Sequence, residues 1–165
     1  IDIIMATLDE FPQYVDKKST EPLANGELDV IELDMPVDPY TGRIIEILKI
    51  EVFIGFNGGQ TVSAWRIGKS PATSTADLGN YGDGDDVLVV DEYQCWSNSG
   101  YAGPLRYEYN FVMGNKGILW PYKKLYFSVA NQNSTVSIGG RGIRVWFRFV
   151  QVRSEELAQI LASQT

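Results

Sequence analysis

Residues 43–56 read RIIEILKIEVFIGF, and this stretch decides the fold class. Its second half places apolar side chains at every other position: Leu48, Ile50, Val52, Ile54 and Phe56. Lys49 and Glu51 lie between them and therefore point to the opposite face. A repeat of two residues is typical of a β-strand and differs from the 3.6-residue repeat of a helix. The stretch predicts a long strand with one face in the core.

The same repeat recurs elsewhere, so that we expect eight strands in all. The further segments are residues 27–34, 61–67, 86–96, 105–111, 125–129, 136–138 and 143–149. The repeat is clearest in residues 105–111, LRYEYNF, where Arg106, Glu108 and Asn110 form a face that water can reach. Turns rich in glycine, asparagine and aspartate separate the segments. The chain is therefore predicted to be all-β, an antiparallel sandwich of two sheets or a barrel.

A helix is predicted near the C-terminus, where residues 154–161 read SEELAQIL. Ser154 is the expected N-cap, and Leu157, Ile160 and Leu161 form one apolar stripe. A helix this short is unstable alone, so its stripe must dock on its own sandwich or on a neighbouring subunit.

The N-terminal part of the chain gives a weaker pattern. Residues 16–25 are mostly polar, which is typical of an arm or linker. The whole length of 165 residues is that of one domain. We therefore expect an N-terminal arm or linker at 1–26, a β-sandwich at 27–153, and a C-terminal helix and tail at 154–165.

Composition excludes several kinds of chemistry. The chain has no histidine and one cysteine, Cys95, which excludes Ser-His-Asp and Cys-His catalytic sites, histidine-containing zinc sites and an internal disulfide. Its formal net charge is −7, and the basic cluster of the C-terminal region lies in an acidic protein, so direct binding of nucleic acid is not expected. No apolar run approaches the roughly 20 residues that a membrane-spanning helix needs. The sequence leaves other membrane contact undetermined.

Charge is divided unevenly between the two parts of the sequence. Residues 1–103 contain 6 basic and 18 acidic side chains, whereas residues 104–165 contain 8 basic and 3 acidic ones. The favoured interpretation is that acidic strands pair with basic strands inside shared sheets. The alternative is that faces of opposite sign meet on neighbouring copies and orient their association.

The last predicted strand carries the candidate binding residues. Trp146 shares one face with Arg144 and Arg148. Tryptophan and arginine are enriched in the residues that dominate protein interfaces, and exposed aromatic rings also stack on sugars. A covering layer, a partner subunit or the C-terminal helix would equally explain the ring. We favour a subunit interface over a sugar site.

Two weaker candidates concern catalysis and metal binding. Glu108, flanked by Tyr107 and Tyr109, is the one acid that would suit a glycosidase, which needs a second carboxyl opposite it. Residues 82–86, GDGDD, offer oxygen ligands for calcium but lack the spacing of an EF-hand, so a solvated turn is favoured. We predict no catalytic residue, no metal site and no cofactor.

Residues 142–149 read GIRVWFRF and precede the helix predicted at 154–161. This arrangement resembles the C-terminal part of the proteins in a known capsid family. Residues 42–50, GRIIEILKI, which open a long strand after a turn, fit the same pattern. In layout, residues 27–165 are similar to the single jelly-roll major capsid proteins of tailless icosahedral viruses, especially those of archaea and thermophilic bacteria. The resemblance implies an eight-stranded antiparallel jelly-roll sandwich with a short C-terminal helix.

The resemblance also implies a function. The protein would be a non-enzymatic capsid subunit of a virion, forming homo-oligomeric capsomers and an icosahedral shell with copies of itself and other capsid proteins. The expected contact residues are Arg144, Trp146, Arg148, Leu157, Ile160 and Leu161. Residues 1–30 contain only Lys17 and Lys18 against seven acids, so an N-terminal arm that condenses a genome is not expected. The alternative is a carbohydrate-binding β-sandwich, either lectin-like or a phage surface module.

Overall fold

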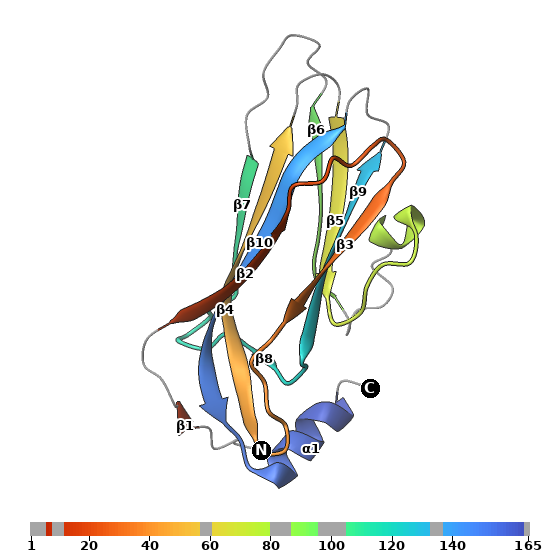
Figure 1. Ribbon diagram of the computed structural model, residues 1–165. Helices are drawn as coiled ribbons and strands as arrows, with labels where there is room; N and C mark the ends of the chain where they lie inside the picture. Colours follow the sequence, from red (N-terminus) through yellow and green to blue (C-terminus); the bar gives the residue numbers. More distant parts are fainter. Residues whose placement is uncertain are drawn as a thin grey trace.

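Two antiparallel β-sheets face each other in the computed structural model (Figure 1). The structure describes residues 6–7, 12–56, 61–79, 87–95, 105–132 and 137–163. The first sheet contains β1 (Ala6–Thr7), β2 (Gln13–Ser19), β4 (Arg43–Phe56), β7 (Leu105–Asn110), β8 (Ile118–Trp120) and β10 (Ile138–Gln151). The second sheet contains β3 (Leu28–Asp34), β5 (Thr61–Gly68), β6 (Val87–Cys95) and β9 (Lys124–Gln132). A short 3-10 helix, η1 (Thr75–Gly79), and α1 (Ser154–Ser163) complete the described elements.

The strand pairing follows the order of a rolled hairpin. Apart from the short strands β1 and β8, the first strand pairs with the last (β2 with β10), the second with the seventh (β3 with β9), the third with the sixth (β4 with β7), and the fourth with the fifth (β5 with β6). Rolling this hairpin then places β10 beside β4 and β9 beside β5. This topology is the jelly roll. The predicted eight-stranded antiparallel sandwich with a C-terminal helix is confirmed.

The core lies between the sheets and follows the predicted repeat. On the first sheet the inward side chains of β4 and β10 are buried: Ile50, Val52, Ile54, Ile143, Val145 and Phe147. They pack with buried side chains of the second sheet: Trp65, Ile67, Leu125, Phe127 and Val129. Each buried large apolar side chain stabilises the fold by about 1.5–3 kcal/mol. The alternating positions of these strands point outward, and they form the face described below.

The strand assignment differs from the prediction in more than the short strands β1 and β8, which were not expected. Residues 13–19, expected to be part of an arm or linker, form β2 and pair with β10, with Val15 opposite Val145. A strand at a sheet edge with one covered face needs few apolar side chains, so its sequence reads as polar. The sequence predicts two strands at 136–138 and 143–149, whereas the structure has one strand, Ile138–Gln151, with a register shift between Ile138 and Arg141.

Helix α1 packs on the sandwich of its own chain. It lies at the end of the sandwich where β4 begins (Figure 1). Leu157 and Ile160 are 5% and 6% exposed and belong to the core, while Leu161 is partly buried against it. The expected cap is displaced by one residue, because the backbone N–H of Arg153 donates to the Glu156 carboxylate at 3.2 Å and the Arg153 carbonyl accepts the first helical bond.

The chain also covers part of the outer face of the second sheet. Ala72 and Leu78, from the segment that includes η1, pack on Ala64 and Ala130. The Ala72 N–H donates to the Ser128 hydroxyl at 3.0 Å. In the described ranges, neither helix has the length and apolar character needed to cross a membrane.

Candidate functional site: the charged face of the first sheet

The outward side chains of the first sheet lie in rows that cross four strands. Because successive residues alternate between faces, strand register decides which side chains share a row. One row contains Asp16, Arg144, Glu51 and Glu108, contributed by β2, β10, β4 and β7 in that order. The neighbouring row contains Tyr14, Trp146 and Lys49. We define the charged face as these residues together with Phe53, Arg106, Arg148 and Glu46.

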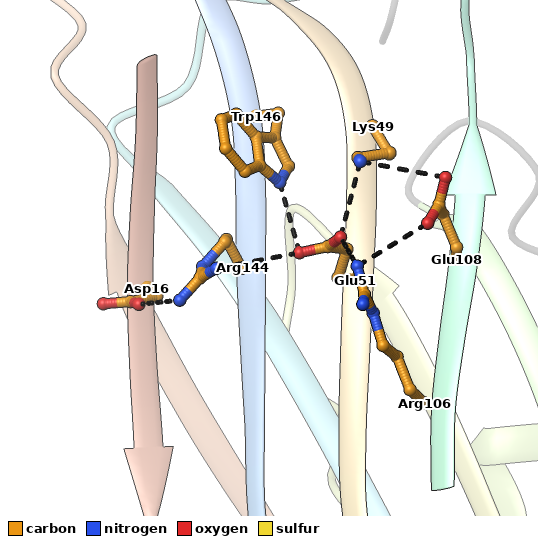
Figure 2. A network of polar contacts seen from close by, with 7 residues as sticks. All are labelled: Asp16, Lys49, Glu51, Arg106, Glu108, Arg144 and Trp146. Atoms are coloured by element: carbon orange, nitrogen blue, oxygen red, sulfur yellow. Dashed lines mark hydrogen bonds and ion pairs between the residues drawn. The ribbon is translucent and has the colours of Figure 1, made fainter. Parts of the chain in front are cut away.

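Glu51 is the centre of the charged face. Its carboxylate is surrounded by four N–H or cationic groups from three strands, as Figure 2 shows. The Trp146 indole N–H lies 3.2 Å from Oε2, and the Lys49 ammonium lies 3.4 Å from Oε1. The Arg106 guanidinium also pairs with Oε1, and Arg144 approaches Oε2 at 4.0 Å. These groups leave the Glu51 side chain only 2% exposed although it points away from the core.

The surroundings of Glu51 keep it ionised. Burial by itself raises the pKa of this carboxyl. The hydrogen bonds from Trp146, Arg106 and Lys49 together outweigh burial, so the pKa is lowered from its ordinary value of 4.5. Glu51 therefore acts as a fixed negative centre that orders the surrounding cations.

Trp146 is held by its neighbours on the same face. The Tyr14 ring lies 5.0 Å from it, tilted by 52°, and the Lys49 ammonium lies 5.2 Å from its ring centroid. The Arg144 guanidinium lies 4.6 Å from the centroid of Tyr14. Such aromatic and cation–π contacts restrict the ring at an outward position.

A second ion pair extends the charged face toward the β7–β8 turn. Arg148 donates to both oxygens of Glu46, at 2.7 Å and 3.1 Å, in a bidentate pair. Arg148 also donates to the Asn115 carbonyl at 2.6 Å, and the Gly117 N–H donates to Glu46. Burial raises the pKa of Glu46, but Arg148 and Gly117 outweigh it and the pKa is lowered. These bonds tie β10, β4 and the turn together.

The structure separates the six predicted contact residues into two groups. Arg144, Trp146 and Arg148 lie together on the charged face. Leu157, Ile160 and Leu161 lie on α1, where they contact the core of the same chain. The apolar stripe of α1 was expected to dock either on its own sandwich or on a neighbouring subunit, and in the structure it docks on its own sandwich.

Sequence reasoning missed most of the partners of Arg144, Trp146 and Arg148, among them Glu46, Glu51 and Tyr14. Glu46 and Glu51 lie in the longest apolar stretch, and their partners depend on the bulge where β4 shifts register against Trp146 and Phe147. Tyr14 lies in the segment that was expected to be an arm. One signal for the site was available in the sequence. Glu51 lies on the outward side of the long strand, and it is opposite a basic strand.

Glu108, the acid considered for a glycosidase, lies beside two cations of the charged face. It is 50% exposed and lies 3.7 Å from Lys49 and 3.8 Å from Arg106. The carboxylate opposite it is Glu51, whose lowered pKa makes it unsuitable as a proton donor. Residues 82–86 lie outside the described residues, and within the described ranges no group of three or more acidic or cysteine side chains could hold a metal ion.

Comparison with known proteins bears on the fold. No family model matches the sequence, and no curated protein matches it. Among solved structures, the unassembled pentamer of Washington University polyomavirus VP1 matches over 91% of this chain and 97% of that chain, with a TM-score of 0.50 and 11% identity. The chain therefore shares the jelly-roll fold of this viral protein.

Other jelly-roll capsid structures match with lower TM-scores. VP1 of Trichodysplasia spinulosa-associated polyomavirus, in complex with GM1 oligosaccharide, has a TM-score of 0.47 and 8% identity over 93% of this chain and 100% of that chain. Desmodium yellow mottle tymovirus has a TM-score of 0.40 and 15% identity over 93% of this chain and 89% of that chain. At these identities the likeness concerns the fold.

Proposed function

We propose that this protein is a non-enzymatic capsid subunit that associates with copies of itself into capsomers and an icosahedral virion shell. The carrying observation is that the jelly roll accounts for nearly the whole of both chains in the comparison with polyomavirus VP1, which is described as a pentamer. The single sandwich with a short C-terminal helix supports the finer assignment to the single jelly-roll type of archaeal and thermophilic bacterial viruses.

The charged face is the proposed contact surface. It combines Trp146 with Arg144, Arg148 and Tyr14, and these residue types dominate the energetics of many interfaces. Tyr14 is 50% exposed, so it remains available to a neighbour. Symmetric repetition of a moderate contact is sufficient for a closed shell. We assign α1 the role of stabilising each subunit.

Other capsid proteins are further proposed partners, and no cofactor is required. The net charge of −7 supports a shell that does not bind the genome directly. The carbohydrate-binding alternative has less support, because the Trp146 ring already contacts Tyr14 and Lys49 and its N–H already donates to Glu51.

Solution mass tests the proposal. Light scattering over protein and salt concentration, followed by electron microscopy, should show discrete oligomers or shells that respond to salt. Tyr14→Ser should shift the assembly to higher protein concentration. Tyr40→Ser is the matched control, because Tyr40 is 93% exposed and lies outside the charged face. A monomer at every concentration, together with binding on a glycan array, would replace the capsid proposal with the carbohydrate one.

A further inference from the structure

A hollow of about 500 Å³ opens at the end of the charged face nearest β2. Its walls include Lys18 and Ser19 of β2, Phe53 of β4, and Arg144 of β10, and its lining includes Gly140 and Gly142. A volume of this size lies within the range of small-molecule sites. The hollow is separate from the carboxylate of Glu51, which does not line it.

Glycine at the outward positions of β10 creates the hollow. Gly142 lies opposite Lys18 on one side and Phe53 on the other, so the row has side chains at both ends and none in the middle. Neighbouring strands are about 4.8 Å apart, which leaves Lys18 and Phe53 roughly 10 Å apart at the backbone. A Cβ added at Gly140 would approach nothing closer than 3.6 Å, so the space above it is open.

The lining is positively charged. Lys18 makes no ion pair with any residue of the described ranges, and Lys17 uses its ammonium for the Glu32 backbone carbonyl at 2.9 Å. Asp16 is the acidic lining residue, and it pairs with Arg144 at 3.1 Å. The Nε of Arg144 is buried and has no hydrogen-bond partner in the described part of the chain.

We propose that this hollow binds a small organic anion whose phosphate or carboxylate group lies beside Lys18 and Arg144. The apolar part of the ligand then lies over Gly140 and against Phe53. The Lys18 ammonium, which has no ion-pair partner in the described ranges, supplies a charge-assisted donor, and the aromatic wall with the glycine floor supplies apolar contact. The hollow shares Asp16, Phe53 and Arg144 with the charged face, but its ligand is a small molecule, so binding is measured separately from self-association.

Titration of the full chain, monitored by backbone NMR, tests the site. Phenyl phosphate and benzoate both carry an anionic group on an apolar ring, and comparing them distinguishes phosphate from carboxylate. Inorganic phosphate tests the charge without the ring. Benzyl alcohol tests the ring without the charge. We expect at least one aromatic anion to shift the amides of Gly140, Gly142 and Lys18, with weaker binding of inorganic phosphate and none of benzyl alcohol. If neither aromatic anion shifts these amides, or if inorganic phosphate binds as tightly as both, the proposal is overturned.

Substitutions locate the binding. Lys18→Gln should weaken binding about tenfold, as expected for loss of a charge-assisted bond. Lys123→Gln is the control, because it removes the same charge at a position that does not line the hollow. Gly140→Leu should fill the space and abolish binding, and Gly140→Ala, which the backbone accommodates, should reduce it in a chain that stays folded. Unchanged affinity in Lys18→Gln and Gly140→Ala would place the anion elsewhere and overturn the assignment.

Discussion

The indole N–H of Trp146 donates to Oε2 of Glu51 at 3.2 Å, diagonally across β10 and β4. Lys49, directly opposite Trp146, contacts the other carboxylate oxygen at 3.4 Å. The two oxygens therefore have different donors, and the carboxylate links adjacent rows of the sheet. Removing the charge of Glu51 leaves Lys49, Arg106 and Arg144 close together without their shared counter-ion.

Glu51→Gln should lower the free energy of unfolding by about 1–3 kcal/mol, because it removes a buried acceptor from several cations. Denaturant unfolding measures this change. Glu108→Gln is the matched control in the same row and should change stability by less than about 0.5 kcal/mol, since that side chain is half exposed. Equal effects of the two substitutions would contradict the central role of Glu51.

Stability should fall on acidification. The pKa values of Glu46 and Glu51 are lowered below their ordinary 4.5, because the hydrogen bonds from their basic and N–H partners outweigh burial. A carboxyl whose pKa is lower when folded stabilises the protein above the unfolded pKa, and this contribution is lost as the pH falls through the folded pKa. The unfolding midpoint should therefore be nearly constant around neutral pH, where the absence of histidine removes the usual titrating group, and should drop below about pH 4.5.

The double substitution Glu46→Gln with Glu51→Gln tests the origin of that drop. It should make the protein less stable near pH 7 and flatten the acid dependence, because neither position then takes up a proton. Thermal melts across a pH series provide the measurement. An acid dependence as steep as in the unsubstituted protein would assign the effect to other carboxyls.

Gly42→Ala should destabilise the protein by about 3 kcal/mol or more, for steric and conformational reasons together. Gly42 has φ +74°, and an added Cβ would lie 2.0 Å from the carbonyl oxygen of Val152, at the junction with α1. Gly26→Ala is the control, since Gly26 has φ +81° with nothing within 4 Å and should cost about 1–2 kcal/mol. If the unfolding curves of the two variants coincide, the contact between residue 42 and the Val152 carbonyl does not contribute.

Leu157→Ala and Ile160→Ala should each lower the unfolding free energy by about 2–4 kcal/mol, because both side chains are buried in the core. Gln159→Ala, on the exposed side of α1, should change it by less than about 0.5 kcal/mol. Denaturant unfolding at low protein concentration isolates the effect in the subunit. Unchanged unfolding combined with weaker assembly would show that α1 clamps a neighbour.

The sequence was sufficient to predict most of the fold, because core strands carry an unambiguous two-residue repeat. One exception is β2, where Val15 packs against the core and the strand as a whole has a polar sequence. A second exception is the start of β10, where Gly139, Gly140 and Gly142 interrupt the alternation, so that the sequence does not show that the strand is continuous.

The candidate site was predicted only in part, because a sequence shows which residues share a face of one strand but not which strands are neighbours. Arg144, Trp146 and Arg148 share a face by alternation within one strand, which a sequence shows directly. Their partners belong to other strands, and the partner of each depends on register. The bulge near Leu48 changes that register by one residue, so that Arg148 meets Glu46 while Arg144 meets Glu51.

The position of β10 has a consequence for the order of events during synthesis. β10 follows the other described strands in the sequence, yet it lies between β2 and β4. Asp16 and Arg144, whose side chains pair across this junction, are 128 positions apart. A nascent chain therefore keeps open hydrogen-bonding edges on β2 and β4 until β10 has emerged, and closing so long a loop is slow. Contacts that require the finished sheet can form only after β10 has joined it, which delays association until the sandwich is complete.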